Sequence, residues 1–268
     1  MHILDTCVHF SYSFLVTLSA RQAIELFHLV FLRALVAKGE DKSLFAVKGG
    51  CNLRFFFGSV RYSEDIDLDV TVVAKGTLKN RIDRLLASPP VTAPLRARGI
   101  EVVDVSTPKQ TDTTQRWKAG LRADGISLEL RTKIEFSRRD EIDGAAFEAV
   151  GGEIARAYSL SPFPATHYAS AKAIAQKIQA LAGRNEPQAR DVFDLSHLFA
   201  TPKATTPLSD ADRARLSTAI DRAMSLSFDE YEAQVVAYLD PDQRDLFAGR
   251  DAWNVMQDGV VAKLESLR

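Results

Sequence analysis

The 268-residue sequence predicts an α/β (α+β) fold in its N-terminal half and a helical domain in its C-terminal half. Three observations predict this arrangement. Helix and strand patterns alternate up to about residue 150, strand patterns fade after about residue 155, and a series of helical patterns follows. We therefore expect two domains, residues 1–155 and residues 156–268, and we expect the second to contribute to the active-site cleft.

The elements of the N-terminal half follow from the spacing of its apolar residues. They are, in order, a helix over residues 20–38 ending at Gly39, a strand over 44–47, a short helix over 51–57, a strand over 64–73, a helix over 77–87, and at least three strands between 99 and 136. The last strand, over 126–136, shows a clear alternation. Its expected buried face carries Ile126, Leu128, Leu130, Thr132, Ile134 and Phe136, and its polar face carries Glu129, Arg131, Lys133 and Glu135.

The C-terminal half reads as helices separated by prolines. The expected helices cover residues 166–183, 188–200, 208–225, 228–238 and 250–266. Prolines fall between these segments or at their first turns, where a missing backbone N–H costs nothing.

Composition and charge are those of an ordinary globular protein. The chain has 34 basic and 35 acidic residues, so it lacks the global basic excess of a DNA-coating protein, although a local basic patch would suffice for a nucleic-acid substrate. Two cysteines without a Cys-x-x-Cys pair argue against a disulfide scaffold and a structural zinc site, and we expect a cytoplasmic protein. The apolar run over 8–18 is too short to span a membrane, so we expect no membrane partner.

The strand over 64–73 carries aspartates at alternate positions, Asp65, Asp67 and Asp69. Alternate side chains of a strand share a face, so the three carboxylates repel one another and require a compensating cation. Two aspartates two residues apart on a rigid strand suit Mg²⁺, which prefers oxygen ligands. A solvent-exposed acidic strand face is the alternative interpretation.

The pair Gly49-Gly50 precedes this strand by fourteen residues. Without side chains, these glycines let backbone N–H groups approach an anion closely, and the short helix that follows adds its positive end. A phosphate cradle and metal-binding carboxylates are the two parts that phosphoryl or nucleotidyl transfer needs.

Two stretches of the chain resemble known nucleotidyltransferases. Residues 48–69 resemble the signature of the DNA-polymerase-β-like superfamily, in which Gly-Gly or Gly-Ser is followed by Asp-hydrophobic-Asp-hydrophobic. More narrowly, Lys-Gly-Gly-x-x-Leu over 48–53 and Arg-x-Ser-x-Asp-Ile-Asp-Leu over 61–68 resemble the AbiEii toxins of type IV toxin–antitoxin systems. A Lys-x-x-Ala-Leu segment over 177–181 and an Arg-Asp-x-x-Asp-Leu segment over 190–195 resemble the same family.

This resemblance implies a nucleotidyltransferase-type mixed sheet flanked by helices. It also implies transfer of a nucleoside monophosphate from an NTP to an acceptor, the 3′ end of a tRNA in the first instance, with an arrest of translation and a cognate antitoxin as partner. On the matching positions, Asp65 and Asp67 would bind two Mg²⁺ ions, and Gly49 and Gly50 would bind the phosphates.

A third carboxylate usually completes such a site, and two candidates fit the hydrophobic–acid–hydrophobic pattern. They are Glu129 and Glu135, which lie on the polar face of the same predicted strand. Glu135 is favoured because Lys-Ile-Glu resembles the end of this strand in the family. A charged residue on a solvated sheet face is the alternative for either.

Further site candidates carry charge. Lys177 lies at the edge of an apolar helix stripe, and Asp191 lies in the first turn of the next helix. The functional interpretation is that Lys177 contacts the nucleotide phosphates while Asp191 orients it or a neighbouring group. A snorkelling lysine and an acid favoured by the helix dipole are the alternatives.

Arg61 and Ser63 share the strand-face parity of Asp65, so Arg61 would neutralise the acidic face or bind a triphosphate, and Lys48 would act likewise. Asp194 is expected to cap its helix or pair with Arg190. Basic residues that would contact RNA phosphates occur over 75–84, 96–98, 116–118 and 131–139.

Two other functional classes share these features. A small-molecule nucleotidyltransferase, such as an enzyme that adenylylates an aminoglycoside, would need an acidic pocket for its cationic sugar, and a protein hydroxyl is another acceptor. A non-catalytic binding module of the same fold would ordinarily have lost one carboxylate of the pair, and both are present.

Overall fold

The computed structural model describes residues 17–37, 42–201 and 208–268. Nearly all of the apolar run over 8–18 and the expected helix end at Gly39 lie outside the described residues. No helix among those described is long and apolar enough to cross a membrane.

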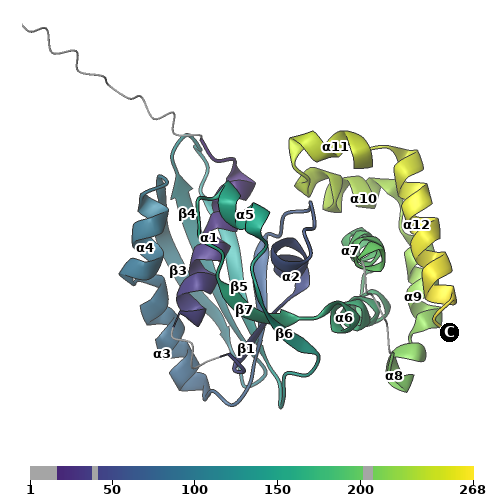
Figure 1. The fold of residues 1–268 in the computed structure, drawn as a ribbon, viewed down its shortest axis with the longest axis horizontal. Coiled ribbons are helices and arrows are strands. Elements are labelled where there is room, and N and C mark those ends of the chain that lie inside the picture. The colour runs from purple at the N-terminus through teal and green to yellow at the C-terminus, as the bar shows by residue number, and fades with distance from the viewer. Residues whose placement is uncertain (1–16, 38–41, 202–207) are drawn as a thin grey trace, which may run out of the picture.

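A seven-stranded mixed sheet forms the centre of the N-terminal half (Figure 1). Its strands are β1 (Phe45–Lys48), β2 (Asp65–Val70), β3 (Ile100–Gln110), β4 (Thr114–Ala123), β5 (Leu130–Arg138), β6 (Ala145–Ala149) and β7 (Pro164–Tyr168), in the order β3-β4-β5-β2-β1-β7-β6. Strand β2 runs parallel to β5 and antiparallel to β1, and β1 runs parallel to β7. The predicted α/β class and the mixed sheet are confirmed.

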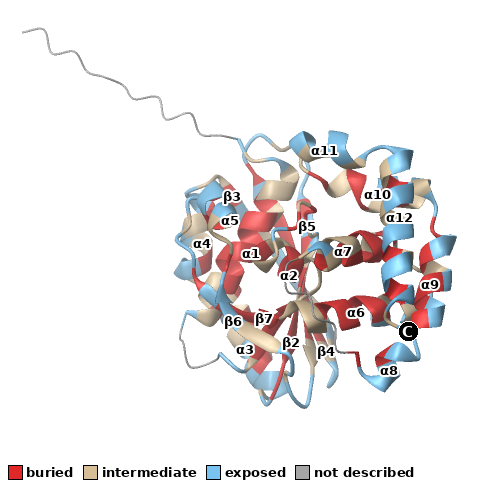
Figure 2. Cartoon of the chain, turned by 45° about the vertical axis from the view of Figure 1, so that its right-hand side comes forward, coloured by how far each residue is buried: buried red, intermediate tan, exposed pale blue. Residues whose placement is uncertain are grey.

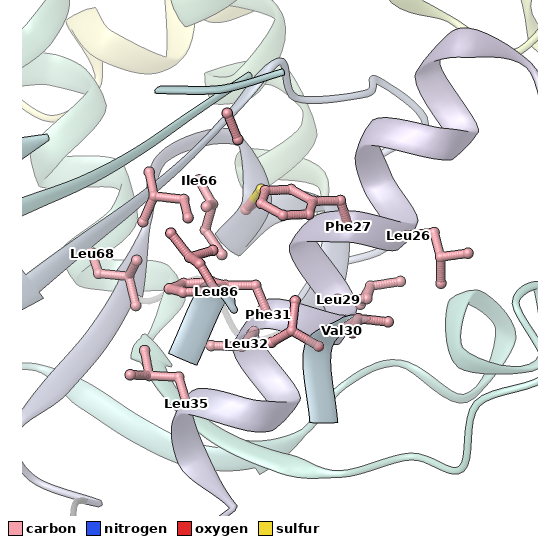
Figure 3. Packing of buried hydrophobic residues seen from close by; sticks show 14 of the residues in the cluster. Leu26, Phe27, Leu29, Val30, Phe31, Leu32, Leu35, Ile66, Leu68 and Leu86 are labelled. Carbon is pink, nitrogen blue, oxygen red and sulfur yellow. The ribbon is translucent and has the colours of Figure 1, made fainter. Parts of the chain in front are cut away.

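Helices cover one face of this sheet. They are α1 (Ala20–Val36), α3 (Lys75–Leu86), α4 (Pro89–Arg96) and the short α5 (Gly152–Ala157), while α2 (Gly49–Phe56) connects β1 towards β2. Figure 3 shows Phe27, Phe31 and Leu35 of α1 packed near Ile66 and Leu68 of β2. Burial of these side chains, worth about 1.5–3 kcal/mol each, fixes which face of β2 is the core face.

The C-terminal half has its own hydrophobic core. Its elements are α6 (Ser170–Gly183), α7 (Ala189–Ala200), α8 (Asp210–Arg213), α9 (Leu216–Ser225), α10 (Phe228–Gln234), the 3₁₀ helix η1 (Val236–Tyr238), α11 (Pro241–Phe247) and α12 (Arg250–Glu265). Figure 2 shows buried residues concentrated along α6 and α7, which lie between the sheet and the outer helices. Leu53 of α2 belongs to this second core, so α2 joins the two halves.

Several predicted elements differ from those observed. The chain forms β7 where the start of a helix over 166–183 was predicted, so strands continue past residue 155. The prolines at 89–90 do not only end the preceding helix: they begin α4, because a fixed φ suits the first helical turn. The helix predicted over 208–225 is divided into α8 and α9, and the one over 228–238 ends as a 3₁₀ turn. Strand β6 and helices α5 and α11 were not predicted.

The strand predicted over 126–136 starts later, at Leu130. Gly125 adopts a left-handed conformation with φ of 77°, and the chain enters β5 only after this turn. Leu128 therefore leaves the expected buried face and is 77% exposed, whereas Ile134 on the same predicted face is fully buried.

This difference predicts unequal costs for two similar truncations. Ile134→Ala should lower the free energy of unfolding by about 2–5 kcal/mol, because it leaves a cavity under α1. Leu128→Ala should change it by no more than about 0.5 kcal/mol. Urea unfolding followed by circular dichroism measures both, and equal losses would contradict the observed start of β5.

A buried ion pair connects the loop before β2 to α7. The Arg61 guanidinium donates hydrogen bonds to both carboxylate oxygens of Asp194, each 3.0 Å from Nη2, and both side chains are buried. Arg61 also forms an isolated β-bridge with Leu239. The Arg61–Asp194 pair therefore fixes the helical half against the acidic strand.

Removal of this arginine should destabilise the protein strongly. Arg61→Ala leaves the Asp194 carboxylate buried with one partner fewer, which costs about 3–5 kcal/mol in comparable pairs. The control is Arg131→Ala, which removes exposed pairs with Asp104 and Glu129 and should cost no more than about 1 kcal/mol. If chemical denaturation gave equal losses in the free energy of unfolding for the two variants, the buried pair would not be a major contributor to stability.

Candidate active site

The three aspartates of β2 lie on the sheet face opposite α1, while Ile66 and its apolar neighbours are fully buried on the other face. The register with β5 places Asp65 opposite Lys133 and Asp67 opposite Glu135. Lys133 Nζ lies 2.9 Å from Asp65 Oδ2. A compensating cation was predicted for this face, and for Asp65 it is the neighbouring strand's lysine.

Asp69 is the buried end of this row. Its carboxylate accepts hydrogen bonds from Lys48 Nζ at 2.5 Å, Arg139 Nε at 3.1 Å and the Tyr168 hydroxyl at 2.7 Å. All of these donors come from the sheet or directly follow β5. Asp69 therefore neutralises Lys48 and fastens three strands together, and it has little capacity left for a ligand.

Asp67 differs from both neighbours. It is half-buried and makes no hydrogen bond or ion pair with any described residue. Burial raises its pKa, the nearby carboxylates of Asp65 and Glu135 raise it further, and the ammonium groups of Lys133 and Lys48 oppose the shift. A partly desolvated carboxylate without a direct partner is suited to bind a cation.

A cavity of about 350 Å³ opens in front of Asp67, between the sheet and α6. It is lined by Lys48, Gly49, Asp67, Arg139, Gln176, Lys177, Gln179, Ala180 and Arg184. Four of these side chains are basic and one is acidic. Such a lining favours a polyanion placed next to one carboxylate, which is the charge pattern of a metal-bound triphosphate.

The glycine pair lies where side chains would not fit. Gly49 begins α2 with φ of 67°, and a Cβ there would lie 3.3 Å from Asp67 Oδ2. A Cβ on Gly50 would lie 2.6 Å from Ser63 Oγ. The helix starts at Gly49, two residues before the predicted start, so the first N–H groups of α2 belong to the glycines themselves.

The structure moves two candidates away from the predicted strand face. Strand β2 begins at Asp65, so Arg61 and Ser63 do not share its parity, and that expectation was wrong. Ser63 Oγ donates a hydrogen bond to the Asp65 carbonyl at 2.8 Å. Arg61 is committed to Asp194 rather than to the acidic face.

Of the two candidates for a third carboxylate, only Glu135 lies beside Asp67. It is paired with Arg116 Nε at 2.6 Å. Glu129 precedes β5 and pairs with Arg131, and its carboxylate lies against Gly120 of β4, on the side of β5 away from β2.

The donor set suits a hard cation, since Asp65, Asp67 and Glu135 offer only carboxylate oxygens. Among the described residues, no three His, Cys, Asp or Glu side chains already form a cluster that could hold an ion. Because Lys133 and Arg116 occupy Asp65 and Glu135, a bound cation would take the place of these two basic side chains.

Lys177 reaches the cavity from α6 and is held by α7. Its Nζ lies 2.9 Å from Asp191 Oδ1 and 2.5 Å from Asp194 Oδ2. Burial acts to lower the pKa of Lys177, but the charges of the two aspartates more than offset it, and the pKa is raised. Lys177 and Asp191 therefore do meet, and Arg184 adds a second partner to Asp191 at 2.9 Å.

Sequence reasoning missed the part that Asp194 plays. It was expected to cap its helix or pair with Arg190, but it pairs with Arg61 and Lys177. The signal was its position one helical turn after Asp191, on the same stripe facing α6. Burial acts to raise the pKa of Asp194, but its two cationic partners lower it, so it remains ionised.

Comparisons with known proteins agree with this geometry. Residues 30–266 match the family described as nucleotidyl transferase AbiEii toxin of the type IV toxin–antitoxin system. The crystal structure of JHP933 from Helicobacter pylori aligns with a TM-score of 0.59 at 19% identity, over 94% of this chain and 96% of that one. A putative nucleotidyltransferase from H. pylori aligns with a TM-score of 0.58 at 20% identity, over 91% and 96%.

At these identities the two crystal structures show a shared fold. The search of curated proteins found no match. The family match spans both halves, from the middle of α1 to the end of α12, and includes the cavity. The chain belongs to the AbiEii family of nucleotidyl transferase toxins of type IV toxin–antitoxin systems.

Proposed function

We propose that this protein transfers a nucleoside monophosphate from an NTP to the 3′ end of a tRNA and thereby blocks translation. The observation that carries the proposal is the unpaired Asp67 carboxylate, which faces a cavity otherwise lined by basic side chains. The reaction forms a bond between the acceptor hydroxyl oxygen and the α-phosphorus. The α–β phosphoanhydride bond breaks, and pyrophosphate leaves.

The residues present fit Mg²⁺, and Asp65, Asp67 and Glu135 would hold it. When bound, two such ions would activate the attacking hydroxyl and stabilise the departing pyrophosphate. The protein contributes rigidity to this site. Strand β5 pairs with β2 from Asp65 onward and β1 pairs with it from Asp67 onward, so the main chain at Asp67 is fixed on both sides.

The triphosphate would lie against the start of α2 and the edge of α6. Gly49 and Gly50 are the first two residues of α2, so their N–H groups have no acceptor within the helix, and a helix N-terminus favours anions. Lys177 and Arg184 face the same cavity from α6 and its C-terminal end. Lys177 is oriented by Asp191 and Asp194 and keeps one N–H donor for a phosphate oxygen, and Arg184 pairs with Asp191 through Nε and keeps its terminal N–H groups.

Charge favours an anionic acceptor. A cationic aminoglycoside would require an acidic pocket, and this cavity has four basic side chains and one acidic one. Exposed basic side chains continue along the same face of the sheet on Lys118, Arg122 and Arg131. Lys118 makes no ion pair with a described residue, whereas an RNA phosphate would compete with Glu101 for Arg122 and with Asp104 and Glu129 for Arg131. Such a surface supports binding to the phosphates of an RNA. The proposed reaction takes place in the cytoplasm. The family match also supports a cognate antitoxin as a partner of this protein.

The decisive experiment incubates the purified protein with total tRNA, Mg²⁺ and each α-³²P-labelled NTP in turn. We expect label on tRNA with one or two of the nucleotides, and loss of labelling when EDTA removes the metal. Label on a protein or an added antibiotic instead would keep the chemistry and replace the acceptor. If nothing is labelled and no NTP binds, the acidic strand is only a solvated face.

Asp67→Asn should separate activity from stability. Labelling should fall by more than about 100-fold, since metal sites lose up to that factor when even their outer shell is changed. The melting temperature should not fall, and we expect it to rise, because the variant removes a half-buried charge without an ion-pair partner.

The matched control is Asp112→Asn, in the exposed turn between β3 and β4. It removes the same charge from a side chain that does not line the cavity, and it should leave labelling unchanged. A large loss of melting temperature in Asp67→Asn would mean that this carboxylate is structural.

A further inference from the structure

A buried polar cluster lies under the acidic strand, on the side away from the cavity. Its members are His28 of α1, Cys51 of α2 and Thr132 of β5, and each is 4% exposed or less. None of them lines the cavity in front of Asp67. Three elements far apart in the sequence therefore place polar side chains together in a core built mainly of apolar side chains.

The first arm of the cluster runs from α1 to the backbone of Glu64. The Thr132 hydroxyl donates its hydrogen to the Glu64 carbonyl at 2.7 Å. His28 Nε2 lies 2.7 Å from the same hydroxyl oxygen. A hydroxyl has one hydrogen, and a carbonyl can only accept, so the hydrogen in the second bond must come from His28 Nε2.

The second arm reaches the next carbonyl along the chain. Cys51 Sγ lies 3.3 Å from the Asp65 carbonyl oxygen and 3.6 Å from His28 Nδ1. Burial lowers the pKa of His28 to about 3, so the imidazole is neutral and Nδ1 carries no hydrogen. The thiol donates its one hydrogen to the Asp65 carbonyl, so Sγ and Nδ1 are in contact without a hydrogen bond. The Asp65 carbonyl also accepts the Ser63 hydroxyl.

These two carbonyls belong to the peptide planes on either side of Asp65. The Glu64 carbonyl lies in the plane before its Cα, and the Asp65 carbonyl lies in the plane after it. Peptide units are rigid, so holding both planes fixes φ and ψ of Asp65. The backbone direction of this residue sets where its carboxylate points, since Cβ is fixed by the backbone.

We propose that His28, acting through Thr132, is a positioning residue that sets the Asp65 carboxylate relative to Asp67, while Cys51 holds the second of the two carbonyls. Cys51 directly follows Gly50, so the same cluster also ties the glycine turn to the strand. This inference rests on the proposed function, because it assigns the cluster to the geometry of the metal-binding pair rather than to stability alone.

Thr132 supplies the sharpest test, because Val and Ser change it by single groups. Thr132→Val keeps the shape and removes the hydroxyl that links His28 to Glu64. Thr132→Ser keeps that hydroxyl and removes a methyl group. The control is Tyr158→Phe, which removes another buried hydroxyl of this core, the one that donates to Glu25. His28→Phe removes the other end of the arm.

The first readout is Mn²⁺ binding followed by electron paramagnetic resonance with a non-hydrolysable NTP analogue. In Thr132→Val and His28→Phe, the half-saturating Mn²⁺ concentration should rise by about 10-fold. Thr132→Ser and Tyr158→Phe should stay close to the unchanged protein. In the labelling assay, kcat should fall in the first two variants, while KM for the NTP changes by less than about 2-fold.

A purely structural cluster would give a different pattern. Thr132→Val and Tyr158→Phe would then lower the melting temperature alike and leave Mn²⁺ binding and kcat unaltered, and the inference would be overturned. Should the unchanged protein bind Mn²⁺ and the analogue but label no acceptor, the proposed function fails, whereas the Mn²⁺ titrations still decide the role of His28. If His28→Phe does not fold, the Val and Ser variants of Thr132 decide it.

Discussion

The register of β2 between β1 and β5 is the constraint on which the rest of the structure depends. It places Ile66, Leu68 and Val70 under α1 and turns three carboxylates to the opposite face, where Asp67 lines the cavity beside α6. Because side chains alternate along a strand, a slip by one residue would bury the aspartates and expose the core residues. Packing of the hydrophobic core therefore also fixes the positions of the carboxylates, because one register of β2 sets both of its faces.

The three aspartates use this register in different ways. Asp69 is buried and accepts hydrogen bonds from three groups. Asp65 forms an ion pair with Lys133 of the neighbouring strand β5. Asp67 alone among them has no direct partner within the described residues, although it is half-buried. A fold selected only for stability would neutralise that charge too. Its unfavourable placement is the local inconsistency expected of a functional position.

Local patterns predicted the parts of the site that lie close together in the sequence. Alternating polar and apolar residues predicted β2, and the glycine pair predicted the close approach of the backbone at the start of α2. Contacts between distant segments carry no such pattern. Nothing in the spacing of Arg61 indicates a partner in α7, yet the pair with Asp194 decides that this arginine is structural. Likewise, the sequence alternates between apolar and polar residues through Leu128, but the turn at Gly125 delays the start of the strand and leaves Leu128 exposed.

Asp194 shows how the two halves form one site. Its carboxylate binds Arg61 from the loop before β2 and Lys177 from α6, so it fixes one cavity wall relative to the strand that forms the other. Such a buried network is costly to assemble, because every charge loses its hydration. It joins the two walls of the proposed site, where an enzyme loses activity on a misplacement of about 1 Å, so its value lies in geometry as much as in stability.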